Sequence, residues 1–140
     1  MTEQNQNPLD LVPESTAKSM KPISGKSQGS VDDLIFCHLY GVVGDWYLSE
    51  ISEDREIAFG FKMINSEPAW EMDDWINNSC EWGDISIKNL QELVNEKFLK
   101  EKDIRFLIAR DLFWEPIKFS EINIDQNTLL YPGTTDRNLS

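Results

Sequence analysis

The chain contains few of the residues that build metal sites and disulfide frameworks. Among 140 residues there is one histidine, His38, and two cysteines, Cys37 and Cys80. Two cysteines are too few for a disulfide scaffold, so we expect free thiols, with a Cys37–Cys80 bridge as the alternative. Without a Cys-x-x-Cys pair, three soft ligands do not make a structural zinc site. Cys37 and His38 are neighbours on a predicted strand and point to opposite faces, so they form neither a metal-binding pair nor a nucleophile–base pair.

Long apolar runs are also missing. No stretch approaches the roughly 18 apolar residues that cross a bilayer. The first residues, MTEQNQNPLDLVPESTAK, lack a basic region followed by an apolar stretch, which is the pattern of a secretion signal. We therefore expect a cytoplasmic protein without a membrane partner.

Basic residues are scarce, with 13 Lys and Arg against 25 Asp and Glu, and the net charge is −12. Such a field repels phosphates and attracts basic surfaces, and a nucleic-acid binder normally carries a basic patch. We therefore expect no direct binding of nucleic acid. Residues 38–122 hold 18 acidic and nine basic residues, whereas residues 1–37 hold five and three. The acidity therefore belongs to the predicted folded domain and not to an acidic tail.

Patterns typical of catalysis are missing as well. There is no glycine-rich phosphate loop, and no lysine has an acid two residues before it, as one common nuclease arrangement requires. Asp45, Glu50 and Asp111 form a candidate magnesium set for a carboxylate-based hydrolase, provided that they meet across neighbouring strands. The plainer interpretation pairs Glu50 and Asp111 with Arg105 or Arg110 at the surface. We expect no catalysis and no cofactor, and keep the hydrolase as an alternative.

What the sequence does contain is enough for one α+β domain, since 40% of its residues are hydrophobic. Residues 1–30 are rich in Gln, Asn, Ser and Pro without an apolar period, so we expect a disordered N-terminal arm. Residues 131–140 follow Pro132 and Gly133 and are expected to form a flexible tail. The single domain is predicted at residues 31–130.

Three strands are predicted at residues 33–40, 45–52 and 57–64, where apolar residues alternate or run together. The turns between them, at 41–44 and 53–56, are short, which favours an antiparallel meander.

A helix is predicted to begin after Ser86, a suitable cap, and to carry an apolar face from Ile87 to Phe98. The last strand is expected within 104–116. Arg110 and Asp111 on it form either an ion pair that pins this strand or part of a binding edge. The predicted fold is thus an antiparallel sheet of four to five strands with one principal helix packed on it.

Four motifs follow one another in this chain: Trp46-Tyr47, SEDREIAFGF at 52–61, SIKNLQEL at 86–93 and ARDLFWEPIKFSEI at 109–122. In their order and spacing the chain resembles the family catalogued as domain of unknown function 2958, over residues 33–122. The resemblance implies a small protein of plasmids and other mobile elements, in a family without an assigned biochemical role. The stretch 67–81 is longer and richer in tryptophan than the link in that family.

The stretch EPAWEMDDWINNSCEWGD, residues 67–84, contains six carboxylates and three tryptophans but no base. One interpretation is that its rings cover the sheet, because buried aromatics contribute strongly to small domains. The other is a partner surface, in which tryptophans anchor a contact and carboxylates attract a basic protein. The predicted partner-binding residues are Glu67, Trp70, Glu71, Asp73, Asp74, Trp75, Glu81 and Asp84.

These features predict a non-catalytic acidic protein-binding domain with a basic, nucleic-acid-handling protein as its partner. In a mobile element, such a domain would mimic nucleic-acid charge and occupy a host nuclease or DNA- or RNA-binding protein, as anti-restriction and anti-CRISPR inhibitors do. The alternative is an adaptor for a basic plasmid or phage replication or partition protein.

Overall fold

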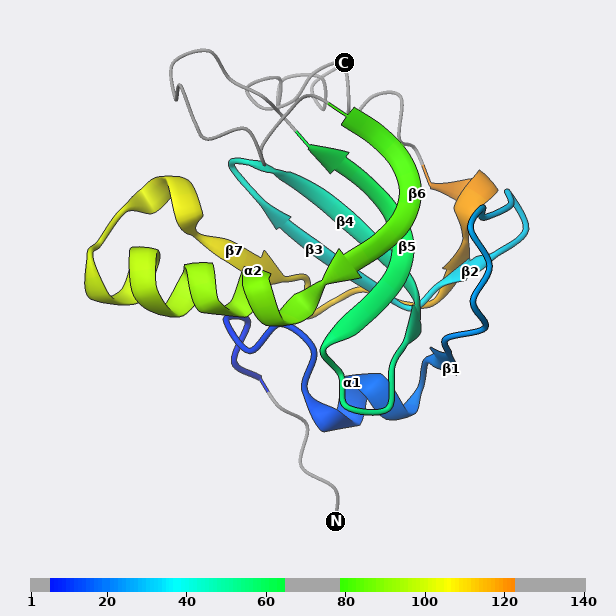
Figure 1. The fold of residues 1–140 in the computed structure, drawn as a ribbon, viewed down its shortest axis with the longest axis horizontal. Helices are drawn as coiled ribbons and strands as arrows, with labels where there is room; N and C mark the ends of the chain where they lie inside the picture. The colour runs from blue at the N-terminus through cyan, green and yellow to red at the C-terminus, as the bar shows by residue number, and fades with distance from the viewer. Residues whose placement is uncertain (1–5, 65–78, 123–140) are drawn as a thin grey trace.

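A mostly antiparallel sheet with one principal helix forms the body of the protein, for which a computed structural model describes residues 6–64 and 79–122. Within these residues the main sheet has six strands, and its longest path runs in the order β6-β5-β4-β3-β7 (Figure 1). All neighbours on this path are antiparallel, and β1 pairs in parallel with the end of β4. The strands are β1 (Lys21–Pro22), β3 (Cys37–Gly41), β4 (Gly44–Ile51), β5 (Ile57–Ile64), β6 (Ser79–Ser86) and β7 (Ile108–Arg110). The predicted fold class is confirmed.

A second, two-stranded sheet and several helical segments complete the described residues. The small sheet pairs β2 (Leu34–Ile35) with β8 (Ile117–Lys118). Within the described segments, no helix is both long enough and apolar enough to span a bilayer. The helical segments are α1 (Glu14–Lys18), α2 (Ile87–Leu93), the π-helical η2 (Val94–Lys100) and the 3-10 turns η3 (Ile104–Phe106) and η4 (Phe119–Glu121).

The helix begins where the sequence predicted it. The Ser86 hydroxyl accepts a hydrogen bond of 3.1 Å from the N–H of Asn89, which satisfies one of the unpaired donors of the first turn. Ile87, Leu90 and Val94 are buried, so the predicted apolar face of the helix is confirmed.

The sheet separates two apolar clusters. The helix face carries Leu39, Trp46 and Ile108, which pack with Leu90 and Val94. The opposite face, here called the aromatic face, is lined mainly by rings. Its members are Ile35, Tyr47, Phe61, Met63, Trp82, Trp114, Phe119 and Ile122.

Residues 6–30 correct the prediction of a disordered arm. In Figure 1 this segment, drawn in blue, follows the body of the domain through α1 and β1. Leu11 and Val12 are buried in the main core, 0% and 4% exposed. The apolar residues of this segment show no helical or strand periodicity, because Leu11 and Val12 lie in irregular backbone. A single packed side chain leaves no local pattern to detect. Residues 123–140, including the predicted tail, lie outside the described residues.

Distant side chains satisfy the backbone of this N-terminal segment. Gln91 accepts from the N–H of Leu11 at 3.0 Å and donates to the carbonyl of Leu9 at 2.8 Å. The Arg110 guanidinium donates to the carbonyls of Asp10 and Asn7, at 3.1 Å each. Arg110 therefore fixes the N-terminal segment, which differs from the expected surface ion pair.

The last strand is shorter than predicted. β7 has three residues, because η3 precedes it and a turn follows at Asp111. The Asp111 carboxylate accepts from the N–H of Phe113 at 3.0 Å and lies 3.8 Å from Nδ1 of His38. Asp111 therefore shapes the turn after the strand.

Candidate functional site: the acidic edge strand

Strand β6 contains the described part of the acidic tryptophan stretch. Two of the predicted partner-binding residues, Glu81 and Asp84, lie on this strand and are exposed. No strand was predicted here, because SCEWGDIS mixes apolar and acidic residues on both of its faces. The other predicted partner-binding residues, Glu67, Trp70, Glu71, Asp73, Asp74 and Trp75, lie outside the described residues.

Glu81 and Asp84 differ in their nearest cations. Glu81 faces Lys62 across the β5–β6 pair, with 3.9 Å between the carboxylate and the ammonium. The Glu81 side chain is 61% exposed, so this pair is worth little. Among the described cations, none lies within 4.0 Å of the Asp84 carboxylate. Lys62 donates instead to the Asp84 carbonyl at 3.4 Å, passing over Gly83.

Trp82 anchors β6 to the aromatic face. Its ring stacks on Phe59 at 5.8 Å, meets Phe61 edge-on at 5.5 Å and lies 4.8 Å from Phe119, measured between centroids. The backbone of Gly29 lies against the indole so closely that a Cβ there would overlap the ring. This tryptophan therefore covers the sheet, as the plainer interpretation of the acidic stretch proposed.

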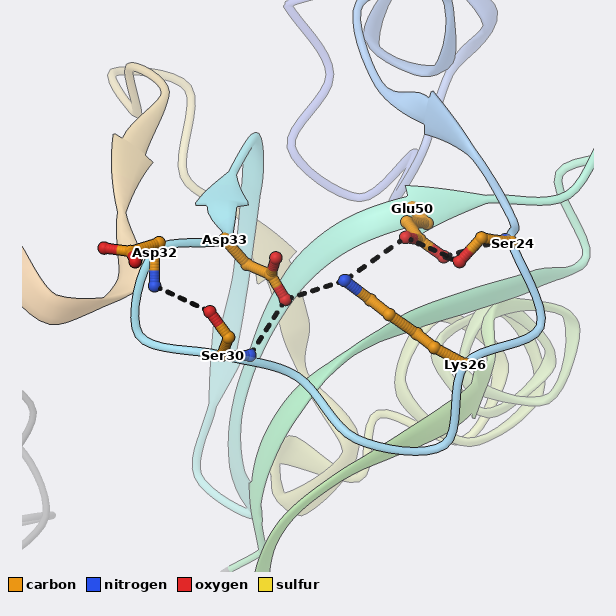
Figure 2. Close-up of polar contacts among 6 residues, drawn as sticks. All are labelled: Ser24, Lys26, Ser30, Asp32, Asp33 and Glu50. Carbon is orange, nitrogen blue, oxygen red and sulfur yellow. Dashed lines mark hydrogen bonds and ion pairs between the residues drawn. The ribbon is translucent and has the colours of Figure 1, made fainter.

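A polar cluster fixes the segment that carries Gly29. Figure 2 shows Lys26 between two carboxylates, with its ammonium 2.9 Å from Asp33 and 3.5 Å from Glu50. Both the N–H and the hydroxyl of Ser24 donate to Glu50, and the N–H of Ser30 donates to Asp33. We call Ser24, Lys26, Ser30, Asp33 and Glu50 the Lys26 cluster.

The Lys26 cluster supports β6 through the aromatic face. The Lys26 ammonium lies over the Phe59 ring, 5.6 Å from its centroid, and Phe59 stacks on Trp82. Glu50 is only 5% exposed, so its charge needs these partners. Its predicted partners are used elsewhere, since Arg105 pairs with Asp103 at 2.7 Å. The cluster thus connects residues 24–33 to the strand next to β6.

The charges of this cluster shift the pKa values of two of its members. Burial by itself raises the pKa of Asp33, but hydrogen bonds from Lys26 and the N–H of Ser30 outweigh it and hold the pKa below its ordinary 3.8. The hydrogen bond to Asp33 raises the pKa of Lys26 above its ordinary 10.5, against the opposing effect of burial. The charged pair is therefore the stable form at neutral pH.

Replacing Asp33 with asparagine is expected to lower the free energy of unfolding at neutral pH by about 1 kcal/mol, because charge-assisted hydrogen bonds are lost. Since the folded-state pKa of Asp33 is lowered, its contribution is present above pH about 4 and is lost as pH falls through that lowered value. The difference in the free energy of unfolding between wild type and Asp33→Asn should therefore become smaller at acidic pH. Urea denaturation at neutral pH and at pH about 3 measures it.

Asp32 provides the control for this prediction. Its backbone N–H, and not its carboxylate, bonds to the Ser30 hydroxyl (Figure 2). Asp32→Asn should leave the free energy of unfolding nearly unchanged at either pH. Equal losses in the two variants would contradict a specific role for Asp33.

The structure does not bring the candidate magnesium ligands together. Asp45 lies 2.8 Å from Nε2 of His38, Glu50 belongs to the Lys26 cluster, and Asp111 shapes its own turn. Within residues 6–64 and 79–122, no three or more His, Cys, Asp or Glu side chains are placed to hold a metal ion. The His38 ring stacks on Tyr47 at 4.6 Å, which gives it a packing role on the aromatic face.

The two thiols are far apart and differ in environment. Cys37 is buried on β3, and burial raises its pKa to about 12, so it is not an activated nucleophile. Cys80 is exposed on β6. Strands β4 and β5 lie between them, a separation of roughly 14 Å that exceeds the reach of a disulfide. Both cysteines are therefore free.

Comparisons with protein-family models, curated proteins and solved structures give no match to this chain. The resemblance to the domain of unknown function 2958 family stays a prediction. In the structure its motifs fall on β4, on the turn into β5, on the start of α2 and from β7 to η4.

Proposed function

We propose that this chain is a non-catalytic acidic domain that binds a basic, nucleic-acid-handling protein and occupies its nucleic-acid-binding groove. The observation that carries the proposal is the exposed pair of carboxylates, Glu81 and Asp84, on the edge strand β6. The ring of Trp82, on the same strand, packs in the aromatic face and fixes the strand to the sheet. Carboxylates on a supported strand lose little conformational entropy on binding, and their field attracts a basic groove.

The charge balance of the described residues supports the proposal. Residues 6–64 and 79–122 carry 18 acidic and 12 basic side chains. Several of these bases serve contacts within the protein: Lys26 holds Asp33 and Glu50, Arg105 holds Asp103, and Arg110 holds the N-terminal backbone. Part of the positive charge that would weaken a negative surface is thus engaged in contacts within the protein.

The proposed setting is a mobile element, as the family resemblance implies, with the encounter in the cytoplasm of its host. There the protein would act as an inhibitor of the anti-restriction or anti-CRISPR type. An adaptor for a basic replication or partition protein would bind its partner without blocking the nucleic-acid site, so competition by DNA separates the two functions.

The test is capture of proteins from a host lysate on the immobilised full chain, followed by elution with duplex DNA. We expect DNA-handling proteins to bind in low salt, and to be released both by DNA and by high salt, because the contact is electrostatic. Captured proteins that resist elution by DNA would contradict charge mimicry.

Reversing both charges, Glu81→Lys with Asp84→Lys, is expected to reduce this capture by about tenfold or more. The matched control reverses Glu53 and Glu56, which are exposed in the turn between β4 and β5 and give the same change in net charge. Circular dichroism checks that both variants stay folded. Equal capture by the two variants would show that net charge alone, and not the β6 surface, attracts the partner.

A further inference from the structure

The two edges of the main sheet differ. At one edge, β7 has three residues, and its Arg110 N–H is bonded to the carbonyl of Pro8 at 2.7 Å. At the other edge, β6 has eight residues and ends the strand order. Among the described residues, no backbone group is bonded to the outer side of β6. A long unpaired edge is the type of surface that accepts an added strand.

The hydrogen-bond pattern shows which groups of β6 face outward. Ile57 directs both its N–H and its carbonyl toward Ser52, on the β4 side. Successive residues of a strand alternate in direction, so Ala58, Gly60 and Lys62 face β6. Their partners Ile85, Gly83 and Glu81 then use their backbone groups inward. The residues with outward N–H and carbonyl groups are therefore Cys80, Trp82 and Asp84.

These outward groups lie on a strand whose conformation is already fixed. Trp82 is held between Phe59 and the backbone of Gly29, and the Lys26 cluster holds that backbone in turn. A partner strand would therefore meet a preformed template and would not have to order it. The contact from the Lys62 ammonium to the outward Asp84 carbonyl, at 3.4 Å, is long enough to be replaced by a peptide N–H.

Charge identifies the occupant. A second copy of this chain would place Glu81 and Asp84 near their own counterparts and bring two molecules of net charge −12 together. An added strand with basic residues opposite Glu81 and Asp84 would instead form opposite-charge pairs on both faces of the sheet. Because the two carboxylates are three residues apart, the basic residues of the partner should be three apart as well.

We infer that β6 binds an extended segment of the partner by strand addition, with Lys or Arg residues three positions apart facing Glu81 and Asp84. The inference rests on the proposed function and adds the mode of recognition. Main-chain hydrogen bonds to Cys80, Trp82 and Asp84 would provide affinity, and the two carboxylates would provide selectivity.

The experiment uses the full chain and a synthetic peptide as long as β6, built from Val and Thr with Lys and Arg three positions apart. We expect binding, together with slowed amide hydrogen exchange at Cys80, Trp82 and Asp84. Exchange at Glu81 and Gly83 should change little, because their N–H groups are already bonded to β5. N-methylation of alternate peptide residues, which removes the donors, should weaken binding by at least about tenfold.

Two protein variants complete the test. Cys80→Pro removes one outward N–H at a position where an edge strand tolerates proline, and should weaken peptide binding, whereas Cys80→Ala should not. The N-methylated peptide gives the same information without altering the protein, should Cys80→Pro fail to fold. Strand addition would be overturned by any of four results: no binding, binding without protection of these amides, binding that is insensitive to N-methylation, or a dimer formed through β6. None of these results would change whether captured proteins are released by DNA. The lysate experiment therefore tests the proposed function separately from strand addition.

Discussion

Alanine in place of Leu11 is expected to lower the free energy of unfolding by about 3 kcal/mol, as for other buried leucines. Leu11 is 0% exposed and packs in the cluster on the helix face of the sheet. Its N–H is held by Gln91, so the surrounding backbone is fixed and cannot readily collapse into the cavity. Urea denaturation followed by tryptophan fluorescence measures the loss.

Leu99 gives the matched control for this substitution. It is 42% exposed in η2, so Leu99→Ala should cost less than about 1 kcal/mol. If the two leucines gave the same small loss, residues 6–30 would not be part of the core. The comparison therefore tests whether the N-terminal segment is folded onto the domain.

Alanine in place of Gly60 is expected to destabilise the protein by about 3 kcal/mol, or to prevent folding. A Cβ at this position would overlap the Tyr47 carbonyl oxygen and lie 2.9 Å from Cα of Leu48. Both are backbone atoms of β4, which is paired on both sides and cannot move away. The irregular register between Leu48 and Glu50 lies at this same point.

Gly83 provides the control on the neighbouring strand. The nearest atom to its added Cβ is the Lys62 side chain, at an ordinary contact distance of 3.8 Å. Gly83→Ala should therefore be neutral or slightly stabilising, because alanine loses less backbone entropy than glycine on folding. The midpoints of thermal unfolding of Gly60→Ala and Gly83→Ala, each compared with wild type, measure the two effects. A stable Gly60→Ala protein would show that β4 and β5 are not packed as described.

Local pattern was enough to predict the centre of the fold. Strands β4 and β5 follow from apolar alternation and short turns, and the Ser86 cap and helix face follow from spacing. The N-terminal segment could not be predicted this way. Its bonds to Gln91 and Arg110 span 80 and 100 residues, so no window of sequence contains both partners.

The candidate site was only partly predictable for a related reason. Glu81 and Asp84 were identified by charge, but the edge strand beneath them was hidden by its mixed faces. Glu50 was expected at the surface, paired with Arg105 or Arg110. The irregular register turns it to the side of Tyr47, since Glu50 pairs with Phe59 as Tyr47 pairs with Phe61. The half-buried Lys26 compensates the charge of Glu50 there, and no local pattern of the sequence places these two residues side by side.

The bonds of the N-terminal segment also set an order for folding on the ribosome. Residues 7–12 are synthesised before the side chains that satisfy their backbone, Gln91 and Arg110, which follow 80 and 100 residues later. Until Gln91 and Arg110 are made, the nascent chain therefore carries Leu11 and Val12 without the residues that enclose them in the folded domain. Closure of the domain waits until β7 leaves the exit tunnel, and the high sequence separation of these contacts slows that final step.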